Sequence, residues 1–185
     1  MLDNVNILLG VTGGIAAFKA VSLASTLTAA GAAVRTVMTD SACQLVGPKS
    51  FEAVTNSAVY TTMWAPSEQH KVDHIALADW ANIIVVAPAT ADIVGKVANG
   101  ICDDLLSTIL CACWSKPTLF APAMNQNMWG NPAVRRNLKA LAELGVDFVG
   151  PVEGRLACGD EGIGRMAEPE DILKYIEQIA SRADR

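Results

Sequence analysis

An apolar run from Val5 to Val11, closed by the pair Gly13-Gly14, restricts the fold more than any other part of the sequence. Such a run, interrupted here only by Asn6, is typical of a parallel strand covered on both faces. The segment from Ile15 to Ala30 is rich in Ala and Leu and predicts a helix, and Gly31 suits a left-handed C-cap. A strand, a tight turn and a helix in this order are the repeating unit of a doubly wound parallel sheet.

The same alternation continues along the chain. Further strands are expected at 33–38, 83–87, 118–121 and 147–149, and helical segments at 48–54, 75–80, 90–113 with a break near Gly100, 132–144, and from Pro169 onward. Residues 56–66 and the Gly-rich stretch 153–166 carry no such pattern and are expected to be irregular. The sequence predicts one α/β domain over residues 1–185, a doubly wound (Rossmann-like or flavodoxin-like) parallel sheet with helices on both faces.

Charge and hydropathy exclude several classes of partner. The net charge is −5 and the pI about 5.0, without any run of Lys or Arg, which predicts no binding to nucleic acid or to an anionic membrane surface. The apolar stretches are strand-length, well short of the ~20 residues of a membrane span. The first residues lack the basic region of a secretory signal, so we expect a cytoplasmic protein.

Cysteine and histidine spacing does not indicate a metal site. The five cysteines include no C-x-x-C pair, and Cys102, Cys111 and Cys113 are expected to be small buried hydrophobic residues. His70 and His74 are four residues apart, but no third ligand accompanies them, so no metal is predicted.

Polar residues that follow the predicted strands are the candidates for ligand binding, because parallel sheets bind ligands at the carboxyl ends of their strands. Gly13 and Gly14 would let backbone N–H groups approach an anion, although a glycine pair is also compatible with a plain tight turn. Thr39 could bind a ribityl or ribose chain, or simply cap a helix. Thr90 and Asp92 place a hydroxyl and a carboxylate at a helix start, where ordinary N-capping is the alternative.

Two later segments indicate a covered or reactive surface. Pro122 to Trp129 places two Met and a Trp directly after a buried strand, so a ligand or another subunit should cover them. Cys158 lies among glycines and charges between Arg155 and Arg165, which is typical of an exposed loop that carries working residues. A thiol near these arginines can titrate close to neutral pH and exchange a proton.

Four segments together carry a family resemblance. They are His74-Ile75, the Pro88–Asp92 turn, the Pro-x-Met-Asn-x-x-Met-Trp string at 122–129, and the Ala-Cys-Gly-Asp-x-Gly-x-Gly-Arg-Met string at 157–166. From about Val5 to Ile179, the chain resembles the homo-oligomeric flavin-containing cysteine decarboxylases, in particular the branch that acts on phosphopantothenoylcysteine in coenzyme A biosynthesis. It departs from the family at Thr90-Ala91-Asp92, where many members have Ser-Ala-Asn. The departure bears on how this turn would contact the flavin and not on the family resemblance.

The resemblance implies an FMN cofactor and a homotrimer, or a higher assembly of trimers, with the site where subunits meet. The residues implied to bind FMN are Gly13, Gly14, Thr39, Thr90, Asp92 and Ala123. The implied substrate is 4′-phosphopantothenoylcysteine, and the products are 4′-phosphopantetheine and carbon dioxide. A hydride passes to the flavin, the resulting thioaldehyde lets the carboxylate leave, and the hydride then returns to the product.

The resemblance also implies individual roles for residues of the chain. His74 would assist oxidation and decarboxylation, Asn125 would hold the substrate carboxylate, and Cys158 would protonate the reduced product. The other implied substrate contacts are Met128, Arg155, Ala157 and Met166.

Two other functions remain as alternatives. One is a peptidyl-cysteine decarboxylase, which stops at the enethiol and needs no proton donor such as Cys158. The other is a non-catalytic flavin-binding regulatory module. A similar domain is fused to a synthetase in many bacteria, so the chain could be the N-terminal part of a longer bifunctional protein.

Overall fold

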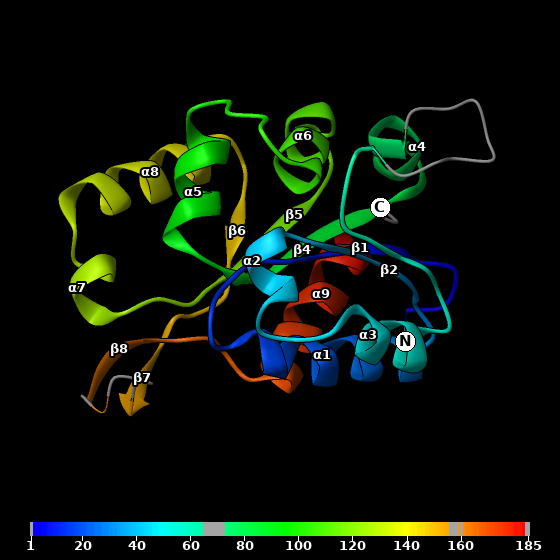
Figure 1. Ribbon diagram of the computed structural model, residues 1–185, viewed down its shortest axis with the longest axis horizontal. Coiled ribbons are helices and arrows are strands. Elements are labelled where there is room, and N and C mark those ends of the chain that lie inside the picture. The colour runs from blue at the N-terminus through cyan, green and yellow to red at the C-terminus, as the bar shows by residue number, and fades with distance from the viewer. Residues whose placement is uncertain (1, 65–72, 156–158, 160, 184–185) are drawn as a thin grey trace.

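The computed structural model describes residues 2–64, 73–155, 159 and 161–183. Its centre is a parallel sheet of six strands in the order β3-β2-β1-β4-β5-β6, as Figure 1 shows. These strands are β1 (Asn6–Val11), β2 (Ala33–Met38), β3 (Val59–Tyr60), β4 (Ile83–Ala89), β5 (Thr118–Pro122) and β6 (Asp147–Phe148). This order is that of Rossmann-type sheets and confirms the predicted fold class.

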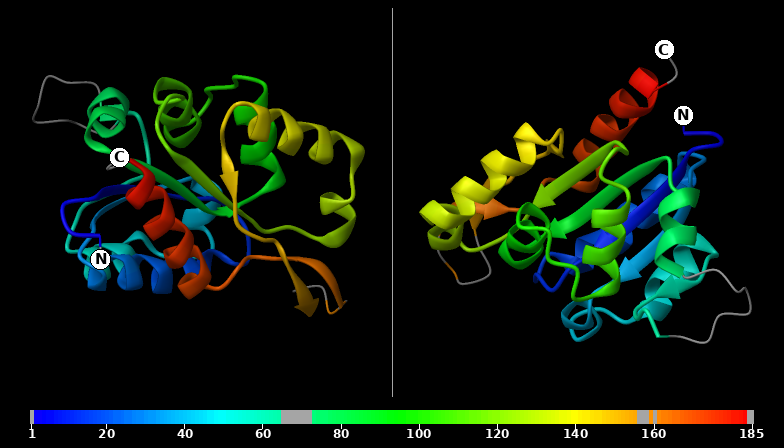
Figure 2. Two further views of the ribbon diagram at one scale, coloured as in Figure 1. Left: turned by 180° about the vertical axis from the view of Figure 1, so that it is seen from behind. Right: turned by 90° about the horizontal axis from the view of Figure 1, so that it is seen from above.

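Helices cover both faces of the sheet (Figure 2). One apolar core, which includes Ile7 and Leu9 of β1, packs under α1, α3 and α9, and a second, which includes Leu8 of β1, packs under α4, α5, α6 and α8. The helices are α1 (Ala17–Ala29), α2 (Asp40–Cys43), α3 (Pro48–Thr55), α4 (Asp73–Trp80), α5 (Ala91–Ala98), α6 (Leu105–Ala112), α7 (Gln126–Trp129), α8 (Pro132–Glu143) and α9 (Pro169–Ala183). None of the helices, as far as they are described, is long and apolar enough to cross a membrane.

The Gly-rich stretch near the C-terminus is more regular than the sequence predicts. Strands β7 (Val152–Arg155) and β8 (Glu161–Arg165) pair antiparallel in a hairpin outside the central sheet. The short strand β3 likewise lies inside the segment expected to be irregular, and α7 follows β5 in a segment for which the sequence analysis lists no helix. The outward residues of the hairpin are mostly exposed, so no apolar alternation marks its strands in the sequence.

The expectation for the cysteines is wrong for two residues of three. Cys113 is buried. Cys102 is exposed in the loop before α6, and Cys111 is exposed on the outer face of α6. Burial raises the pKa of the Cys113 thiol to about 11. A cysteine on an amphipathic helix faces solvent or the core according to its position around the helix axis. Cys111 in the last turn of α6 faces solvent, whereas Cys113, directly after the helix, faces the core.

The strand order fixes where a ligand can bind. The chain leaves β1 toward α1 on one face of the sheet and leaves β4 toward α5 on the other face. The crevice between the carboxyl ends of β1 and β4 is therefore the topological switch point, where open α/β sheets bind their ligands.

Candidate active site

Two cavities open at the carboxyl ends of the strands, one on each side of the β1–α1 turn. The larger, about 760 Å³, is lined by Gly14, Ile15, Phe18, Lys19, Ala123, Met124, Asn125, Arg155, Arg165 and Met166, among others. The smaller, about 450 Å³, is lined by residues that include Thr12, Gly13, Thr39, Thr90, Asp92 and Lys96. Both volumes lie in the range of small-molecule and cofactor sites.

The glycine pair of the β1–α1 turn allows close packing. A Cβ on Gly13 would lie 2.3 Å from Cβ of Ser41, and a Cβ on Gly14 would lie 3.4 Å from side-chain carbons of Pro88 and Thr90. The turn is thus packed tightly against α2 on one side and the β4–α5 turn on the other. Helix α1 starts without a side-chain cap, so its first N–H groups receive no side-chain acceptor from the capping residue.

Thr39 follows β2 and caps the next helix. Its hydroxyl accepts a hydrogen bond from the N–H of Ala42 at 3.3 Å, so Thr39 does cap the helix. The same side chain lines the smaller cavity, so the capping role and a position beside a ligand coexist.

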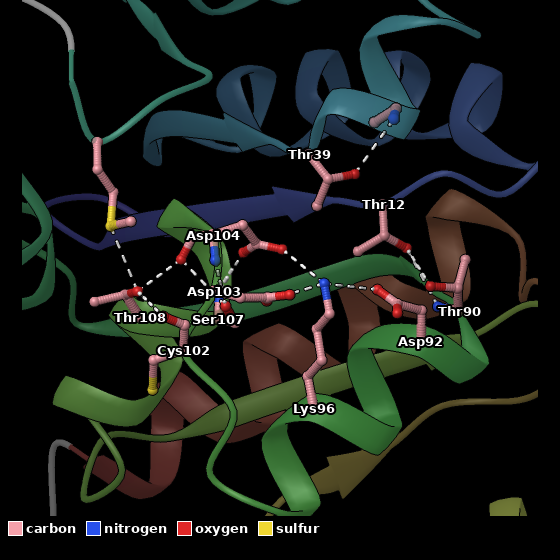
Figure 3. A network of polar contacts seen from close by, with 12 residues as sticks. Thr12, Thr39, Thr90, Asp92, Lys96, Cys102, Asp103, Asp104, Ser107 and Thr108 are labelled. Carbon is pink, nitrogen blue, oxygen red and sulfur yellow. Dashed lines mark hydrogen bonds and ion pairs between the residues drawn. The ribbon is translucent and has the colours of Figure 1, made fainter.

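The β4–α5 turn brings Thr90 and Asp92 into the smaller cavity (Figure 3). Thr90 precedes α5 but makes no side-chain cap hydrogen bond, because its hydroxyl lies 3.2 Å from the hydroxyl of Thr12. The carboxylate of Asp92 lies 3.2 Å from Nζ of Lys96, one turn further along α5. The Lys96 ammonium therefore offsets only part of the negative charge of this cavity wall, which also carries the carboxylates of Asp40, Asp103 and Asp104.

Lys96 is the centre of a larger cluster of charges. Its Nζ also lies 3.0 Å from Asp103 and 3.2 Å from Asp104, which caps α6 by accepting from the N–H of Ser107 at 2.8 Å. Burial alone would lower the pKa of Lys96, but its hydrogen bonds with the carboxylates of Asp103, Asp104 and Asp92 outweigh burial and raise that pKa. The hydrogen bond from Lys96 lowers the pKa of Asp103. This cluster joins α5 to the start of α6 beside the cavity.

The segment after β5 places Ala123 and Asn125 in the larger cavity. Asn125 caps α7 by accepting a hydrogen bond from the N–H of Asn127 at 2.8 Å. Met128 is 47 % exposed and is not among the residues that line either cavity. Trp129 is half-buried, with its ring 4.6 Å from the guanidinium carbon of Arg135. Met124 is also half-buried, so Met128 alone of these three side chains is exposed, and a ligand or subunit that covers them stays a prediction.

The β7–β8 hairpin closes the other side of the larger cavity. Arg155, Arg165 and the buried Met166 line it, and the N–H of Met124 donates to the carbonyl of Gly164 at 3.0 Å. Glu168 accepts from Lys19 at 2.7 Å and from Arg165 at 3.1 Å, so these two cations share one carboxylate. The described lining carries three cationic side chains, and Glu168 offsets one of their three charges, so the cavity keeps a net positive charge that favours an anionic ligand.

Some predicted site residues do not join the others. His74 is half-buried on α4, which packs against α6, and is not among the residues that line the two cavities. Ala157, Cys158 and His70 lie outside the described residues. Within the described ranges, no group of three His, Cys, Asp or Glu side chains could hold a metal ion.

Sequence reasoning missed Thr12, Lys96 and Lys19, all of which line the cavities. The spacing of Asp92 and Lys96, four residues apart at a helix start, was a usable signal for an ion pair. The contacts of Thr12 and Lys19 join segments far apart in the chain, and no local pattern marks them.

Known proteins resemble the chain along almost its full length. A family model described as Flavoprotein matches residues 1–181. The Coenzyme A biosynthesis bifunctional protein CoaBC of Bacillus subtilis (strain 168) is 49 % identical over 178 residues, which are 96 % of this chain and 44 % of that protein. The chain therefore spans less than half the length of this relative.

Two solved structures share the fold and more than a third of the residues. A mutant of PPC decarboxylase complexed with pantothenoylaminoethenethiol is 36 % identical, with a TM-score of 0.87, over 96 % of this chain and 98 % of that one. The FMN binding protein AtHal3 is 38 % identical, with a TM-score of 0.81, over 94 % of this chain and 95 % of that one.

Proposed function

The chain belongs to the flavoprotein family, and from this premise we propose that it uses FMN to decarboxylate 4′-phosphopantothenoylcysteine to 4′-phosphopantetheine and carbon dioxide. The observation that carries the proposal is the larger cavity, where the Asn125 amide and three cationic side chains surround a space beside the Gly14 turn. An anionic substrate with a carboxylate and a phosphate suits this lining. The similarity to PPC decarboxylase and to CoaBC supports the same reaction.

FMN fits the arrangement at the switch point. Helices α1 and α5 both start without side-chain caps and lie on either side of the Gly14–Thr90 contact, so their N–H groups suit a phosphate. We assign the cofactor contacts to Gly13, Gly14, Thr39, Thr90, Asp92 and Ala123. When bound, FMN would accept a hydride from the substrate carbon that bears sulfur and later return it.

The chain's own residues orient the substrate and move protons. The Asn125 amide, fixed by its cap on α7, would hold the substrate carboxylate next to the reacting carbon. Arg155, Met128 and Met166 would contact the remainder of the substrate, together with Ala157. His74 would assist the oxidative half of the reaction, and Cys158 would donate a proton in the reductive half.

We propose that a homotrimer completes the site. His74 lies on α4 and lines neither cavity as described for the single chain, so a neighbouring copy would supply it. Ile15 and Phe18 line the larger cavity yet are 61 % and 62 % exposed, which gives a neighbouring subunit an apolar surface to cover. We also propose that residues 1–185 form one domain, that it acts in the cytoplasm, and that it belongs to a longer bifunctional protein.

The experiment combines a flavin spectrum with turnover and a matched pair of variants. Purified protein should carry or take up FMN, and anaerobic incubation with phosphopantothenoylcysteine should release carbon dioxide and 4′-phosphopantetheine. Asn125→Asp should lower kcat/KM by at least about a hundredfold, because a carboxylate at this position repels the substrate carboxylate. Asn131→Asp is the control, because Asn131 caps α8 by accepting from the N–H of Ala133 at 2.8 Å and Asp can cap as well.

The products separate the proposed activity from its rivals. Cys158→Ser should release an oxidised enethiol in place of 4′-phosphopantetheine. An enethiol product from the unmodified protein would instead favour a peptidyl-cysteine type of decarboxylase. Protein that binds FMN without turning over would favour a regulatory module, and protein that binds no FMN would refute the proposal.

A further inference from the structure

Two cysteines lie at the surface of the molecule beside α6, apart from the site described above. Cys102 is in the loop before this helix and Cys111 is in its last turn, and both side chains are exposed. Neither is among the residues that line the two cavities. The proposed reaction therefore leaves these two thiols without a role.

The fold brings Cys102 and Cys111 to the same side of α6. The hydroxyl of Thr108 lies 3.5 Å from the carbonyl oxygen of Cys102, so the loop that carries Cys102 packs against the helix at Thr108 (Figure 3). Cys111 comes three residues after Thr108, and side chains at this spacing are neighbours on successive turns. Because helical side chains point back toward the N-terminus of their helix, the Cys111 thiol points toward the turn on which Cys102 packs.

The two thiol groups are close enough to interact with each other. Partial desolvation raises the pKa of the Cys102 thiol, and a hydrogen bond with the Cys111 thiol and the charges of Cys111, Asp103 and Asp104 raise it further. Thiols in hydrogen-bond contact need only small rotations of their side chains to reach the S–S bond length of about 2 Å. Cys102 is in a loop and not in the helix, so its backbone can adjust as well.

We propose that Cys102 and Cys111 are a dithiol site, which a low-molecular-weight disulfide oxidises reversibly to an intramolecular disulfide. The thiolate of one cysteine attacks the small disulfide, which forms a mixed disulfide with the protein and releases one small thiolate. The thiolate of the other cysteine attacks the protein sulfur of the mixed disulfide, closes the Cys102–Cys111 bond and releases the second small thiolate. The two protein thiols lose two electrons to the small disulfide, and their two protons pass to the released thiolates.

The dithiol site does not depend on the proposed function, but it adjoins the smaller cavity. Asp103 and Asp104 follow Cys102 directly in the chain, and their carboxylates lie 3.0 Å and 3.2 Å from Nζ of Lys96. Both residues line the smaller cavity. A disulfide from Cys102 to α6 would therefore tether the loop that carries these two carboxylates.

The test treats the purified protein, with any flavin that it carries, with glutathione disulfide at pH 8. The remaining thiols are then blocked with N-ethylmaleimide, and the denatured chain is cleaved before Asp103, which separates Cys102 from Cys111. Mass spectrometry should find the two fragments joined, and dithiothreitol should separate them. In Cys102→Ser and in Cys111→Ser, the remaining thiol should keep a glutathione adduct at least about tenfold more abundant than in the original protein, because no neighbouring thiol displaces the glutathione.

Cys113→Ser is the matched control. Cys113 follows the same helix, but it is buried and its Sγ lies 2.7 Å from the carbonyl oxygen of Ile109, a hydrogen bond that Ser can also donate. This variant should give as much of the joined fragments as the original protein. Glutathione adducts without joined fragments, a disulfide through any other cysteine, or no reaction of Cys102 and Cys111 would each overturn the proposal. These outcomes are read from the original protein, so they hold even if a substituted chain does not fold.

Discussion

Replacing Lys96 with Met should destabilise the protein at neutral pH. The ammonium contacts three carboxylates, of Asp103 at 3.0 Å and of Asp92 and Asp104 at 3.2 Å, and the Lys96 side chain is only 19 % exposed. Met keeps an apolar stem but removes the charge. Three carboxylates then face one another at the junction of α5 and α6, two of them still largely solvated, since Asp92 and Asp103 are 67 % and 58 % exposed.

The expected loss lies between that of a surface ion pair and that of a buried one. Exposed pairs contribute up to about 1 kcal/mol, whereas removing one partner of a fully buried pair costs about 3–5 kcal/mol. The partly buried Lys96 with partly solvated partners should therefore contribute about 2 kcal/mol, equivalent to a fall in Tm of about 4–8 °C for a chain of this length. Urea and thermal unfolding followed by circular dichroism measure both quantities.

The loss should depend on pH in a defined direction. The Lys96 pKa is raised, so its contribution is complete below the unfolded value of about 10.4 and is lost as pH rises through the folded pKa. The Asp103 pKa is lowered, so that contribution is complete above about 3.9 and is lost as pH falls through the folded pKa. The difference in unfolding free energy between the original protein and Lys96→Met should be full from about pH 5 to 9 and should shrink as the pH falls below about 4.

A matched variant provides the control. Lys139 lies 3.8 Å from Glu143 on α8, and both side chains are largely exposed, so Lys139→Met should cost less than about 0.5 kcal/mol. Asp104→Asn keeps an acceptor for the cap of α6. In a double-mutant cycle of unfolding free energies, Asp104→Asn and Lys96→Met should show a coupling energy of about 1 kcal/mol. If Lys96→Met costs no more than Lys139→Met, or if the coupling is zero, the reasoning about this cluster is wrong.

Three further outcomes are expected. Gly13→Ala should lower Tm and weaken FMN binding, because its Cβ would lie 2.3 Å from that of Ser41; an unchanged Tm would contradict this packing. Cys111 should react with iodoacetamide at pH 8 while Cys113, whose pKa burial raises to about 11, stays unmodified in the native protein, as peptide mass mapping can check. Phe120→Ala should destabilise the protein by about 3–5 kcal/mol in urea unfolding, because this fully buried ring would leave a cavity; a loss below about 1 kcal/mol would contradict it.

Strands with a strong apolar pattern could be predicted from the sequence. Residues 33–38 have the bounds of the observed β2, and the run that ends at Val11 contains β1, since both strands are mostly covered from two sides. The two-residue strand β3 and the hairpin β7–β8 could not be predicted. Their residues are half-buried or exposed, and their pairing depends on a partner segment, which leaves no periodic signal.

The positions of the site residues could be predicted more fully than their interactions. Thr39 and Thr90 follow parallel strands, and the structure brings both to one cavity, as the topology requires. The packing of Gly13 on Ser41 and the Lys96–Asp104 pair join separate elements, so the sequence does not indicate them. The resemblance to a family indicated Asn125 and Ala123, which lie together in the larger cavity.

The brevity of the two outermost strands determines how copies of the chain can associate. Strands β3 and β6 end the central sheet on its two sides, and each has only two paired residues. Long unpaired strand edges are where sheets of separate molecules join and aggregate. Within the described residues, the two edges of this sheet offer a neighbour almost no backbone to extend, so a second copy that docked here would contact side chains on helices and turns instead.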